Sequence, residues 1–220
     1  MRLYLGLNKS KHIIPFNYQH YLTGALHKWI GCNNNIHGKL SLYTFSWLQN
    51  INVVIDQGIR LGKDSYFFIS AFDESLIKKI LLGIIKDPTL FADIKVIDAQ
   101  IVEPPDFSQK ETFLVASPVF IKRRFDNQIK HITYDDPACN QYLTETIQKK
   151  LQFAGLSTEG VRIGFDTSKF SPRMKLVRYK EIENRVNICP VIIEGTPEQI
   201  AFAWNTGIGN STGVGFGALK

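Results

Sequence analysis

The histidines of this chain are concentrated near its start. Four of the five lie within the first 37 residues, and His27 and His37 flank a tight turn with Lys39 just beyond it. Two imidazoles that titrate near neutral pH and one ammonium group are sufficient to cleave RNA without a metal ion. One imidazole would take the proton from a 2′-OH, the other would protonate the leaving 5′-oxygen, and the lysine would stabilise charge on phosphorus. The alternative is that His27 and His37 are exposed residues of a helix and a loop.

Basic residues form a second candidate site. The chain has 26 Lys and Arg against 20 Asp and Glu, and its formal net charge of +6 favours an anionic partner. Those that we expect to contact RNA lie beside predicted strands of the second half: Lys122, Arg123, Arg124, Arg173 and Lys175. Arg173 and Lys175 are two positions apart and would share one strand face. Guanidinium and ammonium groups there suit a phosphate backbone, although a solvated sheet face would explain the same pattern.

The C-terminal stretch is rich in glycine. It contains five of the sixteen glycines of the chain, Gly207, Gly209, Gly213, Gly215 and Gly217. Such a cluster indicates a backbone that needs positive φ, or the close approach of another backbone or a ligand. Without Asp or Glu in the stretch, its N–H groups could face a phosphate. Its alternation with Val214, Phe216 and Ala218 equally fits a bulged edge strand. No group in it transfers protons at neutral pH, so it would hold RNA and not cut it.

Other chemistries have little support in the sequence. It contains no phosphate-loop lysine motif, GxSxG elbow, HExxH motif or calcium-binding loop. The acidic pairs Asp135-Asp136 and Glu181/Glu183 stand in polar contexts, so we predict that they are solvated and that the protein uses no metal or cofactor. Three widely spaced cysteines, a start unlike a signal peptide and no apolar run of membrane length predict a cytoplasmic protein.

Apolar periodicity predicts the elements that position these residues. In the first half, helical spacing predicts a helix that ends at Gly31 and another over 73–86, and alternation predicts strands at 2–7, 42–47, 51–55, 65–71 and 94–102. This approximates the β-α-β-β-α-β order of a ferredoxin-like unit. Glu103-Pro104-Pro105-Asp106 is the best linker.

The second half repeats this order. We expect helices over 138–153 and 196–204, a last strand in the glycine tail, and strands at 112–120, 161–165, 174–179 and 186–193. The predicted fold class is therefore α+β, with two tandem ferredoxin-like domains at 1–105 and 106–220.

In several places the sequence resembles the CRISPR repeat endoribonucleases of the RAMP superfamily. The resemblance spans nearly the whole chain. Its parts are the stretch from Pro15 to Gly24, the run Ile36-His37-Gly38-Lys39 leading to Tyr43-Thr44-Phe45-Ser46, the run Leu114-Val115-Ala116-Ser117-Pro118-Val119, and the glycine tail of form GxGxxxxxGxG. The tail is the most distinctive of these parts.

The resemblance implies two tandem ferredoxin-like domains and metal-independent cleavage of CRISPR repeat RNA. The products would carry a 2′,3′-cyclic phosphate and a 5′-hydroxyl. His37 matches a catalytic loop histidine, His27 matches a helix position held by Tyr or His, and Lys39 matches a nearby lysine, with Lys28 as a substitute if the loop displaces it. The resemblance also allows other CRISPR effector subunits, or a second copy of this chain, as partners.

Two alternatives remain open from the sequence. One is a non-catalytic RNA-binding subunit of a CRISPR effector complex. The other is a ferredoxin-like protein that binds a phosphorylated metabolite on its glycine loop.

Overall fold

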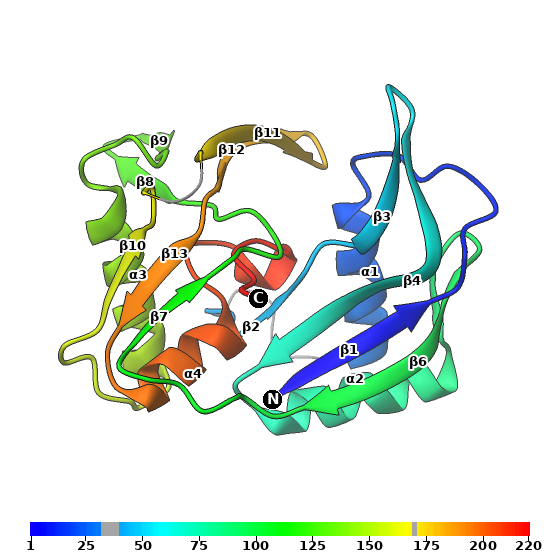
Figure 1. The fold of residues 1–220 in the computed structure, drawn as a ribbon, viewed down its shortest axis with the longest axis horizontal. Coiled ribbons are helices and arrows are strands. Elements are labelled where there is room, and N and C mark those ends of the chain that lie inside the picture. Colours follow the sequence, from blue (N-terminus) through cyan, green and yellow to red (C-terminus); the bar gives the residue numbers. More distant parts are fainter. Residues whose placement is uncertain (32–39, 169–170) are drawn as a thin grey trace.

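The first half of the chain folds around an antiparallel sheet (Figure 1). The structure is a computed structural model that describes residues 1–31, 40–168 and 171–220. The central strand β1 (Arg2–Leu7) pairs with β4 (Gly58–Ala71) on one side and β6 (Ile94–Val102) on the other. Three further strands complete the sheet: β2 (Tyr43–Phe45) and β3 (Gln49–Val54) pair with β4, and β5 (Thr89–Phe91) pairs with β6. The order β2-β4-β1-β6 is that of a ferredoxin-like domain.

Helices α1 (Gln19–Ile30) and α2 (Glu74–Lys86) pack against this sheet. Their apolar positions recur at helical spacing, so each helix buries one stripe in a core shared with β1 and β4. The Asp73 carboxylate caps α2 by accepting a hydrogen bond from the Ser75 N–H at 2.8 Å. At Gly83 the two helices approach so closely that an added Cβ would overlap the backbone of Trp29.

The second half builds a similar sheet. Strands β10 (Arg162–Phe165), β13 (Val191–Glu194) and β7 (Lys110–Phe113) lie in that order and are antiparallel. The chain end continues the sheet beyond β7, because Leu114 and Lys220 exchange backbone hydrogen bonds of 3.0 and 2.8 Å. Helices α3 (Cys139–Phe153) and α4 (Pro197–Thr206) pack in the same core. The predicted pair of ferredoxin-like domains is therefore confirmed.

Two hairpins extend from the second domain (Figure 1). One consists of β8 (Lys122–Phe125) and β9 (Gln128–His131), and the other of β11 (Arg173–Tyr179) and β12 (Ile182–Ile188). The prediction of one strand over 186–193 is wrong, since β12 ends at Ile188 and β13 begins at Val191. The break contains Pro190, which has no N–H to donate to a strand ladder. The strand predicted over 112–120 likewise ends at Phe113.

The glycine tail does not form the predicted alternating strand. Residues Thr212–Val214 form the short 3-10 helix η1, and Gly215 and Gly217 adopt φ of +85° and +67°. These left-handed conformations turn the chain away from an extended path. Pairing with the sheet is confined to the last residues, where the backbone N–H groups of Ala116 and Leu114 donate to the carbonyl oxygens of Ala218 and Lys220.

A buried arginine joins the two halves of the chain. Arg2 of β1 is 1% exposed, and its guanidinium lies 3.9 Å from the ring centroid of Phe68 and 3.5 Å from that of Trp204. It donates to the carbonyl oxygens of Trp204 and Leu219 at 3.2 and 2.9 Å. One large core lies within residues 1–96 and another within 113–219. This separation supports the domain boundary that we propose between residues 105 and 106.

None of the helices in the described ranges is long and apolar enough to cross a membrane.

Candidate functional site

His27 lies in the last turn of α1 and is half-buried. Its carbonyl oxygen accepts the N–H of Gly31, which ends the helix, at 3.1 Å. His27 therefore lies close to the C-terminal end of α1, which residues 32–39 follow in the sequence. His37 and Lys39, the other two predicted catalytic residues, lie in that segment, outside the described residues.

Lys28, the substitute cation, is engaged in an ion pair. Its ammonium group contacts the Asp87 carboxylate at 2.8 Å and also donates to the carbonyl oxygen of Thr89. This hydrogen bond from Lys28 is the main reason that the pKa of Asp87 falls to about 2. Both side chains are partly exposed, so the pair can exchange with solvent ions. A phosphate would compete with Asp87 for this ammonium group.

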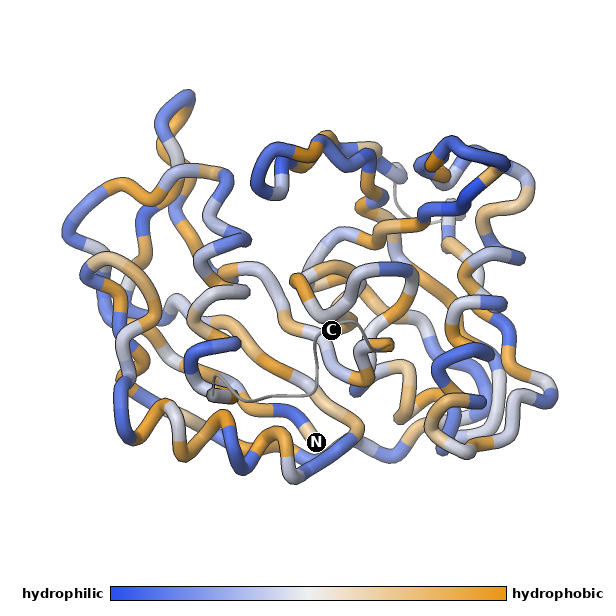
Figure 2. Tube along the Cα trace, turned by 180° about the vertical axis from the view of Figure 1, so that it is seen from behind, coloured by the Kyte–Doolittle hydropathy of each residue, from blue (hydrophilic) through white to orange (hydrophobic). Residues whose placement is uncertain are grey.

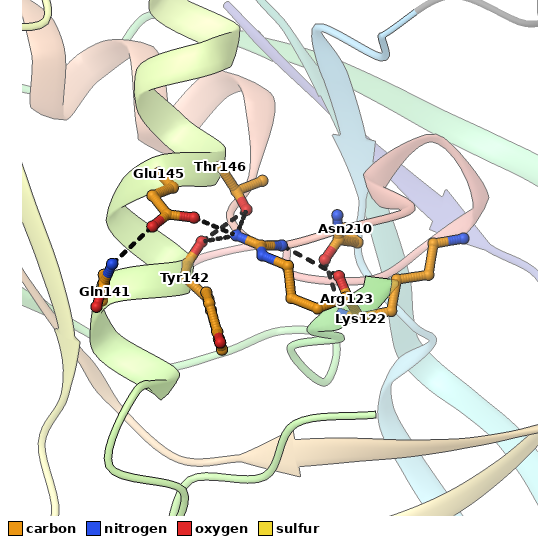
Figure 3. Close-up of polar contacts among 7 residues, drawn as sticks. All are labelled: Lys122, Arg123, Gln141, Tyr142, Glu145, Thr146 and Asn210. Atoms are coloured by element: carbon orange, nitrogen blue, oxygen red, sulfur yellow. Dashed lines mark hydrogen bonds and ion pairs between the residues drawn. The ribbon is translucent and has the colours of Figure 1, made fainter. Parts of the chain in front are cut away.

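The basic strand β8 divides its residues between two environments (Figure 3). Arg123 points to α3, where its guanidinium donates to the carbonyl oxygen of Tyr142 at 2.7 Å and contacts the Glu145 carboxylate at 3.3 Å. Lys122 and Arg124 alternate with it on the strand, and both are exposed. Figure 3 shows the Lys122 side chain extending away from α3. Lys122 and Arg124 are therefore accessible to a ligand, while the Arg123 guanidinium is engaged in contacts with α3.

Strand β11 carries the other predicted basic pair. Arg173 and Lys175 are both exposed, and their cross-strand partners in β12 are Ile188 and Val186. The ammonium group of Lys175 lies 5.3 Å from the ring centroid of Trp47, which belongs to the first domain. Figures 1 and 2 both show the hairpin lying between the two domains, and Figure 2 shows that it mixes hydrophilic with hydrophobic residues.

The five glycines of the tail are all buried. Their surroundings are other segments of the protein: an added Cβ at Gly217 would overlap the carbonyl oxygen of Ile208, and one at Gly215 would overlap the ring of Phe45. This close packing accounts for the glycine spacing without a bound anion.

The tail fastens the first domain to the second. Its carbonyl oxygens accept from side chains of the first domain: Val214 from Gln19 at 2.5 Å, Gly215 from Trp47 at 2.9 Å, and Phe216 from Thr44 at 3.1 Å. Gln19 is the first residue of α1, so the tail also positions the helix that carries His27. On the other side, the side-chain oxygen of Asn210 accepts the N–H of Lys122 at 2.8 Å and connects the tail to β8 (Figure 3).

A buried lysine binds the first part of the tail through hydrogen bonds. Lys150 of α3 is 1% exposed, and its ammonium group donates to the carbonyl oxygens of Thr206 and Gly207 and to the hydroxyl of Thr212, at 2.9–3.0 Å. Burial lowers the pKa of Lys150 to about 7. Sequence reasoning missed this residue, although its place in the apolar stripe with Leu143 and Ile147 was a signal.

The acidic pair Asp135-Asp136 stabilises local turns. The Asp136 carboxylate accepts the N–H of Ala138 at 2.9 Å, just before α3, and Asp135 accepts from the hydroxyl of Thr133. Among residues 1–31, 40–168 and 171–220, no three His, Cys, Asp or Glu side chains gather as they would around a metal ion.

Comparisons with known protein families agree along the chain. The model for the N-terminal part of CRISPR-associated protein Cas6 matches residues 13–102, and the model for its C-terminal part matches residues 102–220. A relative from Methanocaldococcus jannaschii, named CRISPR-associated endoribonuclease Cas6 1, is 26% identical over 100% of this chain and 92% of its own length. A relative from Pyrococcus horikoshii, named a putative CRISPR-associated endoribonuclease-like protein Cas6nc, is 23% identical over 96% of this chain and 95% of its own.

Solved structures share the fold. One, described as a Cas6-related gene product from Pyrococcus furiosus, superposes with a TM-score of 0.86 at 21% identity and covers 100% of this chain and 97% of its own. Another, described as a RAMP protein binding different RNA substrates, has a TM-score of 0.83 at 20% identity, with 100% and 98% covered. With both halves matched by the family models and the whole fold shared, the chain belongs to the Cas6 family of CRISPR-associated proteins.

Proposed function

We propose that this protein is a metal-independent endoribonuclease that cleaves CRISPR repeat RNA to release guide RNAs from the precursor transcript. The observation that carries the proposal is the family match across residues 13–220, together with a full-length relative named an endoribonuclease. The place of action would be the cytoplasm, where such a transcript is made. Other effector subunits and a second copy of this chain remain predicted partners.

The chemistry would use the 2′-OH of the RNA as the nucleophile. Of His27 and His37, one takes the 2′-OH proton and the other protonates the leaving 5′-oxygen. Lys39 stabilises the charge on phosphorus, and its substitute Lys28 would do so in competition with its ion pair to Asp87. The products are a 2′,3′-cyclic phosphate and a 5′-hydroxyl. DNA has no 2′-OH and would not react.

The RNA would contact both domains. The exposed cations Lys122 and Arg124 of β8, and Arg173 and Lys175 of β11, are available to its phosphates. Arg123 would join them only by leaving α3. The five tail glycines are buried, so we propose that they act on RNA indirectly, by holding β8 and α1 in place.

The direct test is cleavage of the protein's own repeat RNA in EDTA. We expect new 5′-hydroxyl and cyclic-phosphate ends, and no cleavage of RNA with a 2′-deoxy nucleotide at the cut site. A requirement for Mg²⁺ would refute the mechanism. The variant His37→Ala should slow single-turnover cleavage by about 10²-fold or more while repeat binding survives. His12→Ala, which removes an exposed histidine of the first domain that we assign no catalytic role, is the matched control and should cleave normally.

A non-catalytic RNA-binding role is the second candidate. The name of the relative from Pyrococcus horikoshii, endoribonuclease-like, is compatible with this role. Repeat RNA that stays bound with no new ends would support this role. A metabolite-binding protein, the third alternative, would show no salt-sensitive affinity for RNA, whereas binding through phosphates weakens steeply with salt.

A further inference from the structure

A small pocket lies where the hairpin β11–β12 meets the start of α1. Its volume is about 220 Å³, and its lining includes Phe16, Tyr18 and Trp47 from the first domain and Lys175, Val177 and Arg178 from the second. Pockets for drug-sized ligands span about 300–1,000 Å³, so this one suits a smaller group. It is built by both domains, and its lining includes Lys175, one of the cations that we assign to RNA.

The side chains at the pocket are not equally committed to the fold. The Trp47 indole N–H is occupied by the carbonyl oxygen of Gly215 at 2.9 Å, so Trp47 is a fixed wall. Phe16, in contrast, is 53% exposed although it is a large apolar residue. An exposed aromatic ring beside a fixed one offers π-faces on which an unpaired base can stack.

Cations complete the pocket. Lys175 is exposed and lies above Trp47, 5.3 Å from its ring centroid. Arg178 is paired with Glu181 at 2.6 Å, but Glu181 is 87% exposed, so water screens the pair and a phosphate can compete for the guanidinium. Aromatic rings interleaved with cations match a nucleotide, which presents a flat base and an anionic phosphate together.

We propose that this pocket binds one unpaired nucleotide of the RNA, with its base stacked on Phe16 and its phosphate at Lys175. This inference rests on the proposed function, because the nucleotide belongs to that RNA substrate. Since the pocket walls come from both domains, the bound nucleotide also fixes the hairpin β11–β12 against α1. The pocket would therefore read an unpaired position of the repeat, apart from the cut itself.

The test measures the affinity of repeat RNA blocked at the cut site by a 2′-deoxy nucleotide. Phe16→Ala should weaken binding by about 5-fold to 150-fold, the range for loss of one base–aromatic stack. Phe16→Tyr keeps the ring and should bind normally, while Phe16→Leu keeps the apolar bulk but should behave like Phe16→Ala. Phe153→Ala is the matched control, because Phe153 is similarly exposed, at 58%, on the last residue of α3.

A scan with abasic nucleotides identifies the base. In the wild-type protein one unpaired position should lose affinity when its base is removed, and Phe16→Ala should abolish that particular loss. Lys175→Met should reduce the slope of log affinity against log salt by about one. These readouts would not move if Phe16 and Lys175 only supported the fold.

The outcomes separate this inference from the proposed function. If the wild-type protein binds no repeat RNA, the proposed function fails. If it binds and cleaves, but Phe16→Ala binds like Phe153→Ala and no abasic position depends on Phe16, the pocket is not a nucleotide site.

Discussion

The buried Lys150 should make the stability of this protein increase with pH. Burial lowers the pKa of this ammonium group from 10.5 to about 7. Between these two pH values the unfolded chain binds a proton that the folded protein does not, so the free energy of unfolding rises with pH. Below about pH 7 both states are protonated, and the cost of burying the charge is fully present.

The magnitude follows from the two pKa values. Their difference corresponds to about 5 kcal/mol, at about 1.4 kcal/mol for each pH unit. From pH 7.5 to 9.5 the contribution of Lys150 should therefore change by about 3 kcal/mol. The variant Lys150→Met removes this pH-dependent contribution, but it leaves three buried oxygens without their donor. That loss costs about 1–3 kcal/mol for each oxygen at any pH.

The assay is urea unfolding of the wild-type protein and of Lys150→Met across this pH range. The variant should be less stable throughout, and the difference from wild type should grow by about 3 kcal/mol between pH 7.5 and 9.5. Lys149→Met is the control, because Lys149 is the exposed neighbour on the same helix and its difference should stay flat. A flat or falling difference for Lys150→Met would refute the reasoning, since it would mean that the three oxygens keep the lysine charged.

Two further predictions concern the tail and the basic strand. Gly217→Ala should lower the free energy of unfolding by at least about 2 kcal/mol, because φ is positive there and the new Cβ would overlap Ile208. Gly24 is the control, because it lies in a helix and an added Cβ would have no neighbour within 4 Å. In the same urea titration, Gly24→Ala should raise the free energy of unfolding by about 0.5–1 kcal/mol. Arg123→Met should cost about 1–2 kcal/mol of stability with little effect on RNA affinity. Arg124→Met should weaken RNA binding and its salt dependence at unchanged stability; the reverse pattern in binding and unfolding measurements would contradict these assignments.

Much of the fold could be predicted because it is encoded locally. The alternation in β1 and the apolar stripes of α1 and α2 arise from residues within one element, and each must bury one face. Repeating this element order across the Pro104-Pro105 linker is enough to indicate two ferredoxin-like domains. The grouping of histidines near the start was likewise visible, although His37 and Lys39 remain predictions.

The contacts that the tail makes with the first domain could not be predicted, because the contacting residues are distant in the sequence. The side chain of Gln19 donates to Val214, 195 positions away, and no local pattern in either segment indicates the other. The glycines indicated a close approach, but the approaching group proved to be the protein itself.

The same limit applies to the charged residues. Composition and spacing treat Lys122, Arg123 and Lys150 alike as basic residues on regular elements. In the folded chain the first is exposed, the second contacts α3, and the third is enclosed with three oxygens. Residue types and local periodicity therefore determine which elements form and which chemistry is available. Packing between distant segments determines which of those groups can meet a substrate, because burial and competing partners exist only in the assembled fold.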